Sequence, residues 1–379
     1  MPHARIAIND LSGTTIVGKG DRVAAEMSVL DPRFYRHAAL HGSVGFGEAY
    51  VDGWWTTDDL LALLRTLAGF RPRAVVGAKL TRAASWAPNA LLRLSRLNTR
   101  AGSRRNIHAH YDLSNEFFGA WLDATMTYSS GLFESQQSTL EQASLAKYER
   151  ICRRIDLRST DHVVEIGCGW GGFAEYAATN FGCRVTGVTI SRQQLSFAQE
   201  RIRRAGLADR VDLQFCDYRD LTGKFDKLVS IEMIEAVGHR YLGTFFAKCC
   251  DLLHPQGQMM VQAITIPDQR FDAYRRNVDF IQKHVFPGGC LPSLGAIHKA
   301  VGRATDLRLL EAVDFAEDYA RTLAAWRERF HAAADQILQL GFDERFMRLW
   351  DYYLCYCAAG FYERQIGLAQ LHFAKPAAR

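Results

Sequence analysis

The stretch Val163–Phe173, VVEIGCGWGGF, decides the fold of this chain of 379 residues. Its two valines and isoleucine predict a short buried strand. Gly167, Gly169, Gly171 and Gly172 then predict a tight turn in which the backbone comes close to a ligand before a helix begins. Because Gly167, Gly169 and Gly172 satisfy the pattern GxGxxG, the segment could hold the pyrophosphate of a dinucleotide, although this pattern alone is a weak signal.

Two nearby features favour a different cofactor. A dinucleotide site needs an Asp or Glu about 20 residues further on to bind the ribose, and residues 187–191, GVTIS, contain neither. Glu165 places a negative charge just before the glycine loop, where it would repel pyrophosphate and attract an ammonium or sulfonium group. The sequence therefore favours S-adenosylmethionine as the cofactor.

Downstream of the glycine loop, apolar stretches alternate with helical patterns. The predicted strands are Val163–Ile166, Val185–Val188, Val211–Phe215, Phe225–Ile231 and Met259–Ile264, and the clearest helices are Ser191–Ala205, capped by Ser191, and Tyr241–Leu253. This alternation predicts an α/β fold with a doubly wound, mostly parallel, Rossmann-like sheet that binds its ligand at the carboxyl ends of its strands. Asp217 follows the third strand, where it could hold the base of a cofactor.

Residues 1–85 predict a small N-terminal domain. Gly45 and Gly47 predict turns, and Trp54 and Trp55 predict buried aromatic anchors. We find no catalytic constellation in this part of the sequence. We therefore interpret it as a docking domain, followed by a basic linker, residues 86–107, and a catalytic domain, residues 108–379.

The segment from Leu60 through Tyr111 contains no Asp or Glu and ten Lys or Arg residues, so it should bind anions. Nucleic acid and an anionic membrane surface both offer phosphates to such a segment. Arg93, Arg96 and Arg100 alternate with leucines at helical spacing, which suits a helix lying on lipid headgroups. A solvated basic linker without a partner is an equally good interpretation of this segment alone.

The composition bounds the class of protein. With 48% apolar and 23% charged residues it is typical of a globular protein, and no run of eighteen apolar residues or signal-peptide pattern is present, so we expect a cytoplasmic location. Nine scattered cysteines without paired CxxC clusters argue against a disulfide framework and against a structural zinc site. We expect reduced thiols and no metal.

Two apolar segments follow the sheet. Phe280–Ser293, FIQKHVFPGGCLPS, combines a forced turn with large apolar side chains and is predicted to cover the ligand end of the sheet. Trp350–Phe361, WDYYLCYCAAGF, is an apolar and aromatic helix that must be buried.

Seven motifs between about Gly42 and Ala374 together resemble a known family. They are HYDLSNEFF, VVEIGCGWGGFAEYAA, GVTISRQQLSFAQERI, DYRDL, FDKLVSIEMIEAVG, FPGGCLPS and YYLCYCAAGF. In this combination the chain is similar to the cyclopropane-fatty-acyl-phospholipid synthases and the mycolic acid cyclopropane synthases. The resemblance implies a class I S-adenosylmethionine-dependent methyltransferase that acts on the double bond of an unsaturated acyl chain, often in a membrane phospholipid. It makes Phe280–Ser293 a lipid-covering insertion.

The resemblance also implies a cofactor site. Besides Glu165, the implied residues are Tyr128, Ser129, Gly167, Cys168, Gly169, Gly171 and Gly172, with Thr189 and Gln194 at the ribose and Asp217 and Tyr218 near the adenine.

The chemistry requires a base. An alkene attacks a sulfonium methyl only when both are aligned in a dry apolar pocket, and the resulting carbocation must lose a proton for a ring to close. The resemblance implies bicarbonate as that base, held by Glu235, the Ile264 backbone and Tyr319. Ser130 and Gln262 stand where the family has cysteine and histidine; both can still donate hydrogen bonds, but the imidazole is lost.

Cys357 matches a cysteine proposed as an active-site residue in the family. Methyl transfer to an alkene needs no thiol, and cysteine is often buried, so we favour a packing role.

The expected reaction is the addition of a methylene bridge across a cis double bond of a phospholipid acyl chain. One alternative is a methyl-branched or methylene-bearing product, formed after a hydride shift. A second is a nucleic-acid-binding methyltransferase, which the absence of an NPPY-type motif disfavours, so we expect no nucleic-acid partner. The expected partners are an anionic phospholipid surface at the inner face of the membrane and an unsaturated acyl chain, and a homodimer is possible.

Overall fold

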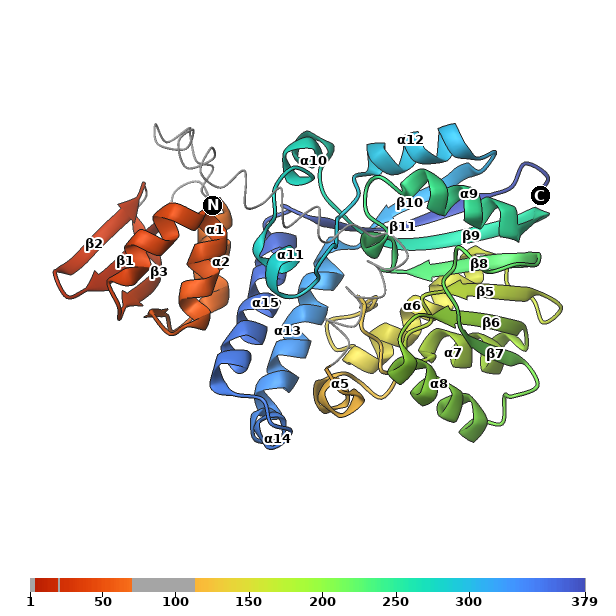
Figure 1. The fold of residues 1–379 in the computed structure, drawn as a ribbon, viewed down its shortest axis with the longest axis horizontal. Coiled ribbons are helices and arrows are strands. Elements are labelled where there is room, and N and C mark those ends of the chain that lie inside the picture. Colours follow the sequence, from red (N-terminus) through yellow and green to blue (C-terminus); the bar gives the residue numbers. More distant parts are fainter. Residues whose placement is uncertain (1–3, 20, 70–112, 379) are drawn as a thin grey trace.

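The computed structural model describes residues 4–19, 21–69 and 113–378, and its centre is a seven-stranded sheet (Figure 1). The strand order is β10-β11-β9-β8-β5-β6-β7. The strands are β5 His162–Ile166, β6 Arg184–Thr189, β7 Val211–Phe215, β8 Phe225–Ile231, β9 Leu253–Thr265, β10 Arg308–Asp314 and β11 Gly367–Ala374. Strands β5 to β9 pair in parallel, whereas β10 and β11 join antiparallel. The predicted α/β class and mostly parallel sheet are confirmed.

Helices cover both faces of this sheet, which explains why its central strands β5 and β8 are largely buried. Val163 packs against α6 Leu140–Arg154, α7 Gly172–Phe181 and α8 Arg192–Arg204 on one face. Its neighbour Val164 packs on the opposite face with α9 Leu242–Leu252 and α12 Leu294–Ala304. Because β5 has β6 on one side and β8 on the other, the strand order reverses at β5, and a crevice at its carboxyl end is the expected ligand site.

The five predicted strands and both predicted helices are present, with ends shifted by a few residues. The Ser191 hydroxyl caps α8 by accepting a hydrogen bond from the Gln194 amide at 3.3 Å. Strands β10 and β11 were missed. The β10 sequence, RLLEAVD, lies at the sheet edge and is largely exposed, so it carries no clean alternation of apolar and polar residues.

Most of the remaining helices lie at the carboxyl ends of the strands. They are α5 Asn115–Trp121, η1 Ile234–Ala236, α10 Asp268–Tyr274, α11 Phe280–His284, α13 Ala316–Ala332, α14 Ala334–Gln339 and α15 Glu344–Tyr362. Figure 1 shows α13 and α15 side by side at this end of the sheet. Trp350 and Tyr353 of α15 are buried, which confirms the predicted burial of this helix.

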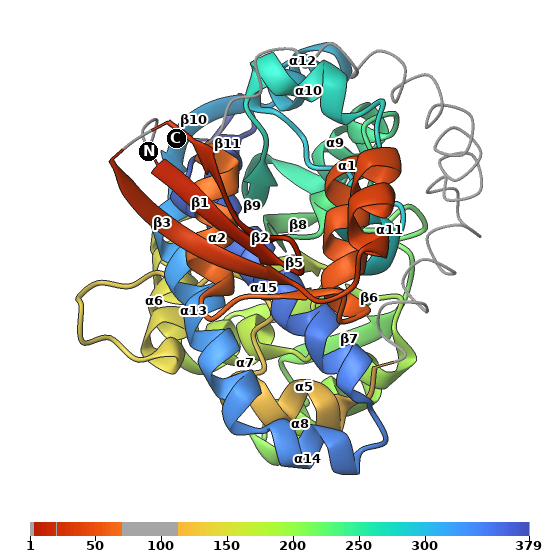
Figure 2. The same cartoon turned by 90° about the vertical axis from the view of Figure 1, so that its left-hand side faces the viewer.

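Residues 4–19 and 21–69 form a second, four-stranded sheet with two helices (Figure 2). The order is β2-β1-β3-β4, from β1 Ala4–Asp10, β2 Gly13–Gly18, β3 Arg22–Val29 and β4 Trp55–Thr56. Helices α1 Arg33–Val51 and α2 Leu60–Gly69 lie between this sheet and α15. Trp55 is fully buried as predicted, and Trp54 is half-buried.

The predicted turns at Gly45 and Gly47 are wrong, because both glycines lie inside α1. The helix bends instead at Gly42, where φ is +59°. At Gly47 a Cβ atom would come within 2.6 Å of the Phe280 ring and 2.7 Å of the Tyr352 ring, so this glycine serves close helix packing.

Several predictions fall on residues outside the described ranges. These are the domain boundary near residue 85, the basic linker 86–107 and the lipid-facing helix with Arg93, Arg96 and Arg100. They stay predictions. Among the residues that the structure describes, no helix is long and apolar enough to cross a membrane.

Candidate active site

A cavity of about 960 Å³ opens at the carboxyl ends of β5 and β8. Its size is at the upper end of the range for small-ligand sites. It is lined by the glycine loop, β8 with η1, the covering segment 280–291, the helices α13 and α15, and parts of α1 and α2. The predicted covering role of Phe280–Ser293 is therefore supported, since Ile281, Phe286 and Leu291 all line the cavity.

The glycine loop is folded tightly against β6. The amides of Gly167 and Cys168 both donate to the Val188 carbonyl at 3.0 Å. Gly167, Gly169 and Gly171 all have positive φ, at +87°, +52° and +82°. A Cβ atom on Gly169 would meet nothing within 4 Å, so the loop backbone leaves room for a ligand at this point.

Glu165 is the penultimate residue of β5, lies at the cavity wall and is 3% exposed. Burial raises the pKa of its carboxyl to about 8, while the charge of Lys147 opposes the shift. Within the described residues, its Oε2 atom has no hydrogen-bond partner. Because a buried polar atom without a partner is costly, this oxygen is suited to a ligand cation such as the one that S-adenosylmethionine carries.

The other predicted cofactor residues line the same cavity. They are Tyr128, Ser129, Cys168, Gly172, Thr189, Gln194, Asp217 and Tyr218; Gly171 caps α7 behind them. The Thr189 hydroxyl donates to Gln194 Oε1 at 3.1 Å, which leaves the Gln194 amide group as a donor for a ligand hydroxyl. The Asp217 carboxylate accepts from Arg219 Nε at 2.8 Å and from its Nη2 at 2.6 Å, a partner that the sequence analysis did not foresee.

The other end of the cavity contains Glu232, which the sequence analysis missed. Its Oε1 accepts hydrogen bonds from the Ser130 amide at 2.9 Å and from Gln262 Nε2 at 2.8 Å. Its Oε2 accepts from the Tyr319 hydroxyl at 2.6 Å. The signal was present in SIEMIEAVG, which has two carboxylates three residues apart, but matching to the family motif selected only Glu235.

Glu235 lies beside Glu232 on η1 and also lines the cavity. Its Oε1 accepts from the Ile264 amide at 2.5 Å, so two predicted site residues bind each other. No described residue forms a hydrogen bond with its Oε2. Burial, reinforced by the charge of Glu232, raises the pKa of Glu235 to about 8, so this group is mainly protonated near neutral pH.

These contacts do not fit the bicarbonate ion that the resemblance implies. The Gln262 amide group and the Tyr319 hydroxyl donate to Glu232, and the Ile264 amide donates to Glu235. The Ser130 hydroxyl donates to the Gly131 carbonyl at 2.9 Å. The expected donors of an anion site are thus brought together, but their partners are the carboxylates of Glu232 and Glu235 and, for the Ser130 hydroxyl, a backbone carbonyl.

The cavity wall opposite the sheet is aromatic. Tyr319 stacks on Phe361 with ring centroids 4.5 Å apart, and the hydroxyls of Tyr128 and Tyr353 are 2.9 Å apart. Cys357 of α15 also lines the cavity. Burial raises the pKa of its thiol well above the ordinary value, so it stays protonated and is a poor nucleophile, in keeping with a packing role.

Comparison with known proteins agrees with this geometry. A family model described as mycolic acid cyclopropane synthetase matches residues 98–371. Tuberculostearic acid methyltransferase UfaA1 of Mycobacterium tuberculosis is 40% identical over 367 residues, which cover 92% of this chain and 83% of that protein. Cyclopropane-fatty-acyl-phospholipid synthase of Escherichia coli is 38% identical over 374 residues, which cover 98% of this chain and 93% of that protein.

A solved structure is similar over most of the chain. It is mycolic acid cyclopropane synthase CmaA1 in complex with SAH and CTAB, with a TM-score of 0.67 and 28% identity, and the match covers 72% of this chain and 98% of that one. The family match spans well over half of the present chain, and the fold is that of class I methyltransferases. The chain therefore belongs to the mycolic acid cyclopropane synthetase family and is an S-adenosylmethionine-dependent methyltransferase.

Proposed function

We propose that the protein adds a methylene bridge across the cis double bond of an unsaturated acyl chain in a membrane phospholipid. The observation that carries this proposal is a single cavity with a buried carboxylate at each end. At the glycine-loop end, the Glu165 Oε2 atom has no hydrogen-bond partner among the described residues, and at the other end Glu232 lies beside an aromatic wall. The first end suits a cationic methyl donor, and the second suits a chain on which positive charge develops.

Glu165, the glycine loop, Thr189 and Gln194 would hold S-adenosylmethionine. Bound there, S-adenosylmethionine supplies an electrophilic methyl group. Asp217 would act at the adenine end together with Arg219, because the two side chains form one ion pair. Bicarbonate is not part of this proposal, since its expected donors bind Glu232 and Glu235.

The aromatic wall would position the acyl chain and exclude water. Tyr319, Phe361 and Tyr353 present rings to the cavity, and aromatic faces stabilise a nearby cation by about 0.5–2 kcal/mol each. Exclusion of water protects a reactive carbocation from hydrolysis. These residues therefore favour alkylation of an alkene over transfer to a polar acceptor.

A second candidate product is a methyl-branched or methylene-bearing chain. The 40% identity to a protein named tuberculostearic acid methyltransferase supports it, as do Ser130 and Gln262 in place of the cysteine and histidine of the motif. The ring closes when the added methyl group loses a proton directly, whereas a methylene-bearing chain first needs a hydride shift from the methylated carbon to the neighbouring cationic carbon.

Mass spectrometry of lipids tests both candidates. The purified chain would be incubated with vesicles of a cis-unsaturated phospholipid and S-adenosylmethionine with a labelled methyl group. We expect a labelled acyl chain heavier by one CH₂ unit, and derivatisation then separates a ring from a methylene group or a branch. No label in any acyl chain would contradict the proposed function.

We also propose that the protein acts at the anionic inner face of the cell membrane. The support is the segment from Leu60 through Tyr111, which contains ten Lys or Arg residues and no Asp or Glu. The test is pelleting with anionic vesicles, before and after Arg93, Arg96 and Arg100 are replaced by Gln. Unchanged pelleting of the triple variant would exclude these residues, and stronger binding to RNA than to vesicles would contradict the membrane role. A homodimer stays a prediction.

A further inference from the structure

Glu232 lies between the cavity and two of the residues expected to hold an anion, Ser130 and Gln262. It lines the cavity, whereas Ser130 and Gln262 behind it do not, and these two are 0% and 1% exposed. A small anion in the cavity would therefore meet the Glu232 carboxylate before it reached either donor. Two like charges in one low-dielectric site repel each other, so the carboxylate and a bound bicarbonate exclude one another.

The backbone at Glu232 is held in an unfavourable conformation. Its φ is +50°, in the left-handed region that favours glycine, and its amide donates to the Gln262 carbonyl at 2.8 Å. A residue with a Cβ atom pays a conformational cost there, and such strain concentrates at functional sites. Glycine would adopt this backbone conformation without that conformational cost. The presence of glutamate here therefore indicates that its carboxylate has a role.

The surroundings of Glu232 hold it as an acceptor. Three donors from three different parts of the chain point at its two oxygens: the Ser130 amide, Gln262 Nε2 and the Tyr319 hydroxyl. The fully buried Lys147, whose Nζ donates to Ser129 Oγ at 2.6 Å, adds a positive charge nearby. Burial and the charge of Glu232 raise the pKa of Glu235 beside it to about 8, which favours a proton on Glu235 rather than a second charge in the site.

Burial and the neighbouring groups shift the pKa of Glu232 in opposite directions. Burial, the largest effect, raises the pKa of its carboxyl, and Lys147, Tyr319, Gln262 and the Ser130 amide lower it; the net direction is upward. A carboxylate that is ionised yet more basic than one in water is better matched to removing a proton near neutral pH.

We propose that the Glu232 carboxylate is the base of the reaction, in the place where the family resemblance implies a bicarbonate ion. This inference rests on the proposed function. The alkene π electrons form the new C–C bond to the donor methyl group as its C–S bond breaks. The added methyl group then loses a proton to Glu232, and the electrons of that C–H bond close the ring. If a hydride first shifts from the methylated carbon to the neighbouring cationic carbon, the same electrons form the methylene double bond instead. Glu232 later returns the proton to water.

The test compares the full-length enzyme with Glu232→Gln, Glu232→Gly and, as a matched control, Glu317→Gln. Glu317 is an exposed carboxylate on α13, outside the cavity. Initial rates of methyl transfer to phospholipid vesicles would be measured in CO₂-free buffer with and without added bicarbonate. We expect the wild type and Glu317→Gln to have the same rate in both buffers.

Glu232→Gln should lower kcat by about 10²- to 10⁴-fold, the usual contribution of a general base, in either buffer. Glu232→Gly should be equally slow without bicarbonate but accelerate when bicarbonate, formate or acetate is added. The glycine keeps the left-handed backbone at no cost and leaves a space lined by the three donors. In Glu232→Gln a trideuterated donor methyl should slow the residual reaction more than in the wild type, because proton removal has become slow.

Thermal unfolding and S-adenosylmethionine affinity of Glu232→Gln, both expected near the wild-type values, show that the fold is intact. A wild-type rate that falls in CO₂-free buffer and recovers with bicarbonate would overturn the inference. So would a Glu232→Gln variant with wild-type kcat. A wild type that labels no lipid in any buffer would instead reject the proposed function.

Discussion

Glu165 shows at the scale of one residue how burial prepares a binding group. Its pKa is raised to about 8 by burial, so in the free protein it is mostly protonated at neutral pH. A cationic ligand stabilises the ionised form and lowers this pKa again. Binding of S-adenosylmethionine should therefore release a proton from Glu165.

We expect the affinity for S-adenosylmethionine to rise with pH by at most about tenfold per pH unit until pH 8 is reached. Calorimetry in buffers of different ionisation enthalpy would measure the released proton. Glu165→Gln should bind more weakly and lose this part of the pH dependence. Equal proton release by the variant and the wild type would show that another group titrates.

The raised pKa of Glu165 also makes the free energy of unfolding depend on pH. A carboxyl group whose folded pKa is raised stabilises the fold fully below its ordinary pKa of 4.5, and this contribution is lost as pH rises through about 8. Between these values the free wild-type protein should lose stability with rising pH more steeply than Glu165→Gln.

At the scale of elements, the contact of α1 with α11 and α15 depends on Gly47. A methyl group at this position would overlap the rings of Phe280 and Tyr352, both of which are rigid and buried. Gly47→Ala should lower the free energy of unfolding by about 1–3 kcal/mol, the usual cost of overpacking. Denaturant unfolding measures this change.

Gly302 in α12 is the matched control. A Cβ atom there would meet nothing within 4 Å, and the residue is exposed. Gly302→Ala should therefore raise the free energy of unfolding by about 0.5–1 kcal/mol, because alanine favours helix over glycine. Equal effects of the two substitutions would contradict the packing role of Gly47.

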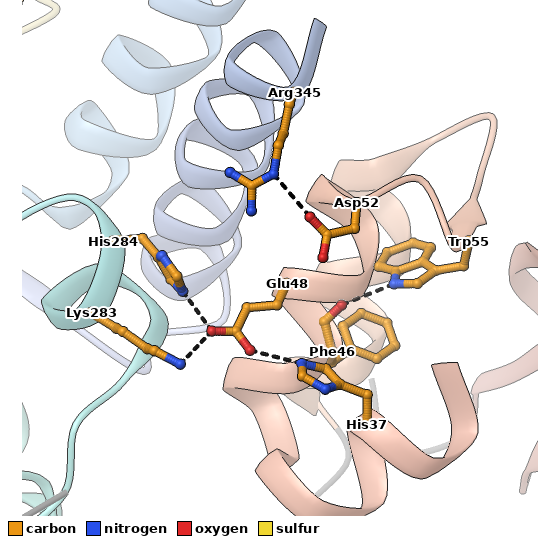
Figure 3. Close-up of polar contacts among 8 residues, drawn as sticks. All are labelled: His37, Phe46, Glu48, Asp52, Trp55, Lys283, His284 and Arg345. Carbon is orange, nitrogen blue, oxygen red and sulfur yellow. Dashed lines mark hydrogen bonds and ion pairs between the residues drawn. The ribbon is translucent and has the colours of Figure 1, made fainter. Parts of the chain in front are cut away.

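At the scale of the whole molecule, Glu48 of α1 connects the N-terminal unit to the covering segment (Figure 3). Its carboxylate accepts from Lys283 Nζ at 2.5 Å and from His284 Nε2 at 2.8 Å, and within its own unit from His37 Nε2 at 2.8 Å. Burial raises the pKa of Glu48, but the hydrogen bonds from His284, Lys283 and His37 outweigh burial and hold it well below the ordinary value.

Glu48→Gln should lower the free energy of unfolding at neutral pH by about 1–3 kcal/mol, because the three donors lose a charged acceptor. A depressed pKa gives stability that is present above the ordinary 4.5 and lost as pH falls below it, so the gap between variant and wild type should narrow in acid. Because Ser43 and Phe46 of α1 line the cavity, the variant should also have a higher KM for lipid.

Asp52 offers the comparison, since its ion pair with Arg345 at 3.0 Å joins the N-terminal unit to α15 at a more exposed place. Asp52→Asn should cost less than about 1 kcal/mol, as surface ion pairs usually do. A larger loss from Asp52→Asn than from Glu48→Gln would contradict the assigned importance of Glu48.

The sequence by itself determined the central sheet and the cofactor end of the cavity. Val163–Phe173 places an apolar strand, a glycine loop and a carboxylate in consecutive positions, so local conformation alone brings Glu165 to the loop. Adjacent residues stay adjacent in any fold, and this is why a linear motif predicts such a site.

Only the tertiary structure decided the arrangement at the other end of the cavity. Ser130, Glu232, Gln262 and Tyr319 come from segments that are far apart in the sequence, and no motif states which carboxylate meets the donors. The choice between Glu232 and Glu235 depends on the left-handed backbone at Glu232 and on the pairing of β8 with β9, which brings Ile231 next to Gln262. Long-range strand pairing and packing, which a single sequence does not express locally, set this arrangement.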